Sequence, residues 1–202
     1  MRQRRIIIFG VVLTVGLLLA IAPASASTVS VQFVGLGGES QNGYYTYPYY
    51  LTINNGPWTP MMCDDFYDHI GVGDGWDANI TQLSSGDMSL TRFGNLAEYE
   101  EAAYLLLQTS LTDSSQWGNI NWAIWMIFDP GADPGPYAPD VDYWLNKAET
   151  VDLSTINFSA VRIVTPIGDH GQEFLYITPE PGTLLLLGTG LIGFWAHRRR
   201  QR

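Results

Sequence analysis

The spacing of apolar residues in the central part of the chain changes from strand-like to helix-like and back again. Residues 28–34 alternate, with Val29, Val31 and Phe33 on one face, and this pattern predicts a half-buried strand. A helical repeat follows in the middle of the chain, where Asn95 suits an N-cap position and Pro130 ends an apolar run. The predicted strands cover 28–34, 44–53, 76–80, 156–165 and 173–178, and the predicted helices cover about 95–108, 113–128 and 140–149.

Helices placed between two sets of strands are typical of an α+β fold. We expect an antiparallel β-sheet or partial barrel with an inserted cluster of about three helices. This acidic globular domain covers residues 27–178 and contains six of the seven tryptophans and all eleven tyrosines. A domain of this size can bury roughly two thirds of its unfolded surface, so it has enough apolar material for a core.

The N-terminal segment has the three parts of a secretory signal peptide. Arg2, Arg4 and Arg5 precede an apolar run over residues 6–21, and small residues then lead to a cleavage point after Ala26. We therefore expect signal peptidase to remove residues 1–26 and the chain to be exported. The alternative is a permanent anchor, which is disfavoured because the apolar run is short for a bilayer core of about 30 Å.

The C-terminal segment, residues 179–202, combines three elements in a fixed order. It begins with a proline–glutamate–proline triplet, continues with an apolar stretch interrupted by glycines, and ends in a cluster of arginines. By the positive-inside rule, the arginines stay in the cytoplasm and the acidic domain lies outside the inner membrane. The triplet is Pro179, Glu180 and Pro181, and the basic residues beside the apolar stretch are Arg198, Arg199 and Arg200.

This tail resembles the PEP-CTERM sorting signal of Gram-negative bacteria. The resemblance implies a precursor held in the inner membrane by a C-terminal transmembrane helix and recognised by an exosortase, a membrane cysteine protease that cuts near the triplet. It also implies release to, or display at, the cell surface, often in bacteria that make exopolysaccharide. The alternative is an ordinary C-terminal helix anchor.

The charge of the domain excludes one class of partner. Residues 27–178 hold 3 basic and 19 acidic residues, a balance of −16, whereas the whole chain has −10. Nucleic acid is not an expected partner, because phosphate binding needs a basic face. Two groups of carboxylates could bind calcium, but neither has the order of an EF-hand, so solvated acidic loops are favoured and no metal or cofactor is expected. The groups are Asp64, Asp65, Asp68, Asp74 and Asp77, and Asp129, Asp133, Asp140 and Asp142.

The single cysteine, Cys63, belongs to a Met-Cys-Asp-Asp-Phe segment, and an Asn-Trp-Ala-Ile-Trp segment begins at Asn121. This pair of segments resembles the signature of bacterial surface thioester domains. The resemblance implies that Cys63 condenses with the side chain at position 121 and captures a surface amine covalently. That family has glutamine where this chain has Asn121, and the missing methylene shortens the reach by roughly 1.3 Å, judged from standard carbon–carbon spacing.

Two other interpretations of Cys63 stay open. Free cysteines are commonly small buried hydrophobes. A secreted cysteine hydrolase would need His69 or His170 beside a thiol of lowered pKa, and the neighbouring carboxylates at 64, 65 and 68 would raise that pKa instead.

Five tyrosines close together offer a possible stacking surface for a polysaccharide, although tyrosine is also a good strand former and plain structure is favoured. They are Tyr44, Tyr45, Tyr47, Tyr49 and Tyr50. Taken together, the sequence predicts an exported, exosortase-sorted, non-enzymatic protein of the cell surface or extracellular matrix. Its expected role is adhesion or association with exopolysaccharide, and covalent attachment through Cys63 is the alternative.

Overall fold

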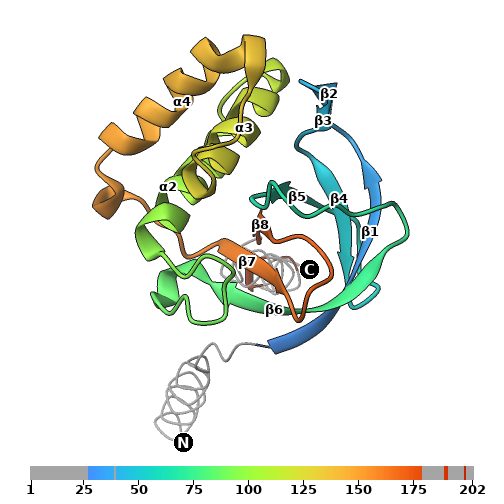
Figure 1. Cartoon of the computed structure of the whole chain (residues 1–202). Helices are drawn as coiled ribbons and strands as arrows, with labels where there is room; N and C mark the ends of the chain where they lie inside the picture. Colours follow the sequence, from blue (N-terminus) through green and yellow to red (C-terminus); the bar gives the residue numbers. More distant parts are fainter. Residues whose placement is uncertain (1–26, 39, 179–188, 191–197, 199–202) are drawn as a thin grey trace, which may run out of the picture.

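Six strands form a closed antiparallel barrel, and three helices form a layer on one side of it (Figure 1). The structure is a computed structural model that describes residues 27–38, 40–178, 189–190 and 198. The predicted α+β class is confirmed, and the barrel is closed rather than partial. Around the barrel the order is β1 (Ser27–Leu36), β4 (Tyr49–Ile53), β5 (Thr59–Cys63), β8 (Phe174–Ile177), β7 (Val161–Pro166) and β6 (Gly75–Gln82).

The first strand shows why the chain closes into a barrel. Val29, Val31 and Phe33 are buried, whereas the residues between them are exposed, as the alternation predicts. Strand β1 pairs with β4 on one edge and with β6 on the other, and its register shifts between Phe33 and Gly35 in the pairing with β4. Such a shift bends and twists a strand, which favours closure of the sheet.

Strand β5 was absent from the sequence prediction, and its burial explains why. Met61, Met62 and Cys63 are all fully buried, so the segment has no alternation of apolar and polar residues. One face of the strand looks into the barrel, and the other is covered by helix α3 (Trp117–Phe128). A strand covered on both faces reads as a short apolar run and cannot be assigned from periodicity.

The three predicted helices are confirmed, with small changes at their ends. Helix α2 (Leu96–Gln108) is capped by Asn95, whose side chain accepts a hydrogen bond from the backbone N–H of Ala97 at 3.2 Å. Asp113 caps a short 3-10 turn, η2 (Ser114–Gln116), which leads into α3. Helix α4 (Ala138–Thr150) packs on α3 and α2, which in turn contact strands β5 and β8.

Two predicted strands were too long. The tyrosine-rich segment 44–53 divides into β3 (Tyr44–Tyr45) and β4, because Pro48 interrupts it, and β3 pairs with β2 (Ser40–Gln41) in a small hairpin. The segment 156–165 becomes extended only at the start of β7. Before that point the carboxylate of Asp152 caps a 3-10 turn, and the side chain of Asn157 accepts from the backbone N–H of Ser159. These local side-chain bonds compete with strand pairing.

The two ends of the barrel differ in what they carry. Strand β1 begins and strand β8 ends at one end, so the described domain starts and finishes there. At the opposite end, β1 and β5 finish and β4 and β8 begin, and the loops that join them carry the residues considered below. The predicted signal peptide, residues 1–26, lies outside the described residues, as does most of the sorting segment.

Candidate functional site

The fold brings Cys63 and Asn121 into contact, although 58 residues separate them. Cys63 ends strand β5, Asn121 lies on the inner face of α3, and both are fully buried. The Asn121 amide nitrogen donates to the backbone carbonyl of Cys63 at 2.9 Å, and its oxygen accepts from the backbone N–H of Tyr47 at 2.8 Å. Asn121 therefore connects α3, β5 and the segment before β4 through both ends of its amide.

The Cys63 thiol is held in an environment that keeps its proton. Burial raises the pKa of Cys63 well above its ordinary value, and the charges of Asp64 and Asp65 raise it further. Its sulfur donates to the backbone carbonyl of Asp65 at 3.2 Å. His69 and His170 are both exposed, as expected from the sequence. A thiol in these surroundings is a poor nucleophile.

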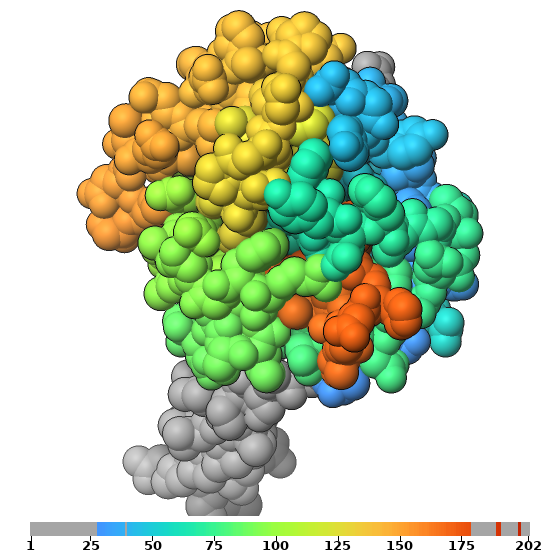
Figure 2. Space-filling model, viewed as in Figure 1, coloured from blue at the N-terminus to red at the C-terminus, as the bar shows by residue number. Residues whose placement is uncertain are grey.

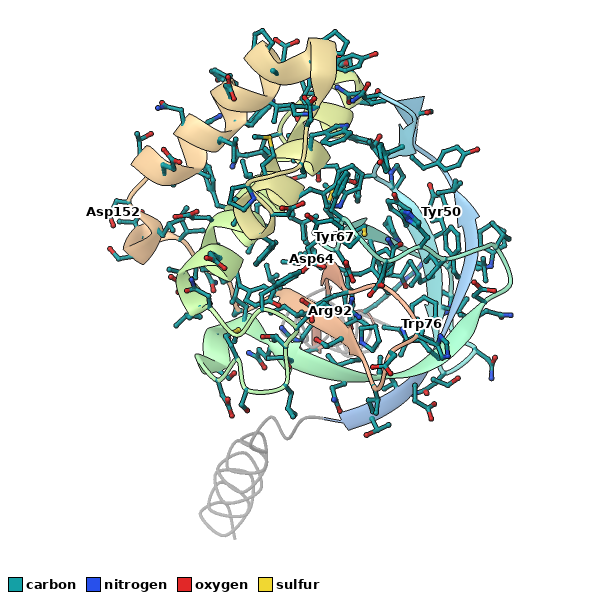
Figure 3. The ribbon with its side chains drawn as sticks, in the orientation of Figure 1. Tyr50, Asp64, Tyr67, Trp76, Arg92 and Asp152 are labelled. Carbon is teal, nitrogen blue, oxygen red and sulfur yellow. The ribbon has the colours of Figure 1, made fainter. Side chains whose placement is uncertain are left out.

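A buried carboxyl pair, Asp64 and Glu173, lies where the helices meet the barrel, close to the labelled Arg92 (Figure 3). Glu173 accepts hydrogen bonds from the hydroxyls of Tyr99 and Thr165, and from the backbone N–H of Arg92 at 2.9 Å. Neither oxygen of Asp64 meets a donor among the residues that the structure describes. Burial raises the pKa of Asp64 well above its ordinary range, and the Glu173 charge raises it further. With three donors on Glu173, the proton of the pair belongs on Asp64.

The guanidinium of Arg92 fixes the loop that follows β5. It forms ion pairs with Asp65 and Asp68 and donates to the backbone carbonyl of Gly171 at 3.2 Å. The side-chain nitrogen of Gln172 also donates to the backbone carbonyls of Asp65, at 3.1 Å, and Asp68. Two loops at the same end of the barrel are thereby joined. No sequence signal pointed to Arg92, Gln172 or Glu173, and Asp64 was considered only as a calcium ligand and as a neighbour of Cys63.

Several of the carboxylates considered for calcium are buried or hydrogen-bonded within their own loops. Asp64 and Asp65 are buried, and Asp74 accepts a hydrogen bond from the backbone N–H of Gly71 at 2.7 Å. In the second group, Asp129 and Asp133 bond to nearby backbone N–H groups of their own loop. Within residues 27–38 and 40–178, no set of three or more carboxylate, histidine or cysteine side chains has the geometry to hold a metal ion.

A cavity of about 660 Å³ opens at the end of the barrel where β1 and β5 finish, and we call it the barrel-mouth cavity. Its walls come from the ends of β1 and β5, the start of β4, the β2–β3 hairpin, the loop 69–72 and helix α3. Its polar lining residues are Asp65, His69 and Gln172. Its aromatic lining residues are Phe33, Tyr44, Tyr45, Tyr49, Phe66 and Trp125.

The aromatic side chains of the barrel-mouth cavity support one another. The Phe66 ring lies 4.9 Å from the Tyr44 ring and 5.4 Å from the Trp125 ring, between centroids. Tyr49 contacts Phe33 at 6.0 Å and donates its hydroxyl to the backbone carbonyl of Tyr45. Aromatic pairs at these separations stabilise one another by about 0.5–1.5 kcal/mol beyond their buried area. These rings therefore pack on one another, while Tyr45 stays 56% exposed.

The five clustered tyrosines divide between core and cavity. Tyr49 is buried in the barrel, and Tyr47 and Tyr50 are partly buried. Tyr44, Tyr45 and Tyr49 line the barrel-mouth cavity. The sequence interpretation that favoured plain structure is correct for part of this segment, and the rest of it presents aromatic faces to an open space.

Comparison with protein families identifies one part of the chain. Residues 178–200 match the PEP-CTERM protein-sorting motif, and the match includes Pro179, Glu180 and Pro181 as well as Arg198, Arg199 and Arg200. The predicted sorting signal is confirmed. The chain therefore carries a PEP-CTERM sorting motif, which implies export, processing by an exosortase and sorting to the membrane or cell surface.

The other comparisons find no protein similar to this chain. Neither the search of curated proteins nor the search of solved structures gives a match. The resemblance to thioester domains thus receives no support from them, and the thioester remains a prediction. Among the described residues, no helix has the length and apolar character that crossing a bilayer requires. The residues of the predicted C-terminal helix lie largely outside the described ranges.

Proposed function

We propose that this exported protein binds a neutral segment of exopolysaccharide in the barrel-mouth cavity, and that it acts by adhesion rather than by catalysis. The observation that carries the proposal is the set of aromatic rings around a cavity of about 660 Å³. Cavities of about 300–1,000 Å³ with mainly apolar walls and a few polar groups are typical of ligand sites, and the mouths of β-barrels are common places for them.

The chemistry of a sugar ring suits these walls. A pyranose presents an apolar face of C–H groups and a polar edge of hydroxyls. The faces of Tyr44, Tyr45 and Phe66 can pack against the apolar side, while Asp65 and His69 offer polar partners to the edge. The balance of −16 on residues 27–178 disfavours an acidic polymer, because like charges repel at close range.

The position of the cavity also supports a role at a surface. The matched sorting motif begins at residue 178, directly after strand β8. Strand β8 ends at the opposite end of the barrel from the barrel-mouth cavity. A protein tethered through its tail would therefore present the cavity away from its point of attachment, toward the material outside the cell.

A pair of exposed tyrosines allows a matched test. Tyr45 is 56% exposed and lines the cavity, whereas Tyr143 is 59% exposed on α4 and lies outside it. Calorimetric titration with exopolysaccharide isolated from the producing strain should give binding to the exported protein. Tyr45→Ala should weaken binding by about two- to tenfold, since loss of one aromatic stacking contact costs about 0.5–1.5 kcal/mol. Tyr143→Ala should leave it unchanged.

Two results would overturn the proposal. One is absence of binding by the unaltered protein at millimolar concentrations of repeating unit. The other is equal behaviour of the Tyr45 and Tyr143 variants. Circular dichroism of both variants provides the control for folding, because each removes only an exposed side chain.

Covalent capture of a surface amine through Cys63 and Asn121 receives less support. The Asn121 amide contacts the backbone carbonyl of Cys63, and the Cys63 sulfur donates to a different carbonyl. A cysteine hydrolase receives less support as well, because burial raises the pKa of Cys63 and both candidate histidines are exposed.

A further inference from the structure

An exposed tryptophan lies at the end of the barrel where strand β8 passes into the sorting segment. We call this end the tail end, and it comprises the first residues of β1, the β4–β5 turn over residues 54–58 and the last residues of β8. In Figure 2 the start of β1 lies at the lower edge of the domain, and the helical layer and the β2–β3 hairpin lie at the upper edge. Strands β5 and β8 run antiparallel with Met62 opposite Leu175, so Trp58 lies beyond the level of Ile177.

The Trp58 ring is presented to the surroundings by a fixed turn. It is 65% exposed, whereas the four tryptophans of the core are at most 8% exposed. Its centroid lies 6.2 Å from that of the Tyr50 ring on strand β4. The Asn54 side chain accepts from the backbone N–H of Ser30 at 3.0 Å, and the backbone N–H of Asn54 donates to the Ser30 carbonyl at 2.7 Å. The turn is therefore attached to β1, and its aromatic ring projects outward.

The tail end differs from the rest of the domain in charge. The loops 64–74 and 167–173, at the mouth end, hold six of the 19 carboxylates of residues 27–178. Arg162, the second residue of β7, places one positive charge beside the tail end. An acidic domain is repelled by acidic surfaces, so its neutral end is the one that can approach a bilayer. No charged side chain occurs in the segments that form the tail end, which are residues 27–28, 54–58, 83–86, 156–160 and 177–178.

The length of the chain beyond β8 limits how far the tail end can lie from a membrane. Strand β8 ends at Ile177, and the apolar stretch of the sorting segment begins at Leu184, so residues 178–183 are the whole connection. Six residues span about 20 Å even when fully extended. A chain whose apolar stretch is held in a bilayer therefore keeps the tail end close to the lipid surface.

We propose that the tail end docks on the phospholipid surface of the membrane that holds the sorting segment, with the Trp58 ring among the lipid headgroups. Tryptophan is enriched at the boundary between lipid and water, because its ring is apolar and its N–H can hydrogen-bond. Asn54 and Asn55 offer amide groups to the headgroups, and Arg162 offers the opposite charge to lipid phosphate. A second copy of the chain suits this face less well, because stable homodimer interfaces are mainly apolar.

The test measures contact between Trp58 and lipid in the chain that retains its sorting segment. The chain is placed at one copy per nanodisc, either in phosphatidylcholine or in phosphatidylcholine brominated on its acyl chains near the headgroup. Bromine quenches indole fluorescence only at close contact. The unaltered chain should lose more fluorescence in the brominated discs than Trp58→Phe, and the difference belongs to Trp58. Trp195 of the sorting segment is the same in both chains and cancels from the comparison.

A matched control moves the indole to the other end of the barrel. Trp58→Phe combined with Tyr45→Trp keeps the number of tryptophans of the unaltered chain. Tyr45 is 56% exposed and lines the barrel-mouth cavity, so the new indole would lie at the end away from the lipid. This double variant should lose no more fluorescence in brominated discs than Trp58→Phe alone. Circular dichroism checks folding, because only exposed side chains are changed.

Three results would overturn the docking proposal. One is equal quenching of the unaltered chain and Trp58→Phe. Another is quenching at position 45 as large as at position 58, because a domain that tumbles freely on its tether would show both. The third is a Trp58 ring that bromine does not quench in single-copy discs but that is shielded from acrylamide when two copies share a disc, since a second copy would then cover this face. Sugar binding is measured separately, so the two proposals can fail independently.

Discussion

Replacing Asn121 by leucine should destabilise the folded domain strongly, because one side chain satisfies two buried backbone groups. Leucine has the same number and branching of side-chain heavy atoms as asparagine, so the change removes the hydrogen bonds while keeping the shape of the side chain, and its bulkier methyl groups act in the same destabilising direction at this buried position. The N–H of Tyr47 and the carbonyl of Cys63 would then lose their partners. Each buried, unpaired backbone group costs about 1–3 kcal/mol, so the free energy of unfolding should fall by about 2–6 kcal/mol.

The expected fall in the free energy of unfolding is large relative to the total stability of the domain. Domains of this kind are stable by about 5–15 kcal/mol, so the variant would lose a large share of its stability. Urea denaturation followed by tryptophan fluorescence measures the change, with an unchanged slope showing that the transition stays the same. Asn146→Leu is the control, because Asn146 is exposed on α4 and should change stability by less than about 0.5 kcal/mol.

If Asn121→Leu unfolds at the same urea concentration as Asn146→Leu, the amide is not what joins α3 to the barrel. Asn121→Gln gives a further comparison, since it restores the residue of the thioester family but adds a methylene to a fully buried position. Overpacking of a core by one methylene costs about 1–3 kcal/mol.

Three further predictions concern other parts of the molecule. The raised pKa of Asp64 means that the folded state holds a proton that the unfolded state releases, so the free energy of unfolding should decrease as pH rises above about 4. Asp64→Asn should flatten this dependence in denaturation at several pH values, and an equally steep dependence in the variant would contradict the assignment. The thiol of Cys63 should react with iodoacetamide only after unfolding, and the intact mass of the native domain should show no loss of ammonia. A native mass lower by about 17 Da, from the ammonia lost in the condensation, would instead establish the thioester. Glu180→Ala should leave the C-terminal tail attached in the producing cell, as judged by immunoblot with a tag before residue 178, and normal processing would count against the sorting role of the triplet.

Sequence patterns predicted the helices and every barrel strand except β5, because each of these elements has a local periodicity. The alternation around Val31 and the capping side chain of Asn95 are visible within a few residues. Strand β5 was missed because Met61 and Met62 are both fully buried, which removes the alternation. Closure of the barrel could not be predicted from the sequence either, because it depends on the pairing of β5 with β8.

In the candidate site too, the residues of a linear motif could be predicted, whereas contacts made across the fold could not. The sorting signal is a linear motif, so it could be recognised from residues 178–200 alone. Cys63 and Asn121 were paired through a resemblance, and the fold brings them together, but the observed bond joins an amide to a backbone carbonyl. The carboxyl pair could not be predicted, because Glu173 meets Tyr99 across 74 residues and neither lies in a recognisable motif.

The aromatic cavity could be anticipated only in part. A cluster of tyrosines around Tyr45 suggested a stacking surface, but Phe66 and Trp125 reach the same cavity from a loop and from a helix. Their convergence depends on the closed barrel and on the helical layer together. Side chains from five separate segments cannot be assembled from spacing along one chain.

The most direct test of the account is a crystal structure of the protein with an oligosaccharide prepared from the exopolysaccharide of the producing strain. The account predicts a sugar ring in the barrel-mouth cavity, packed against Tyr45 and Phe66, at a concentration that saturates binding in solution. A sugar bound elsewhere on the domain, with this cavity empty at saturation, would contradict it.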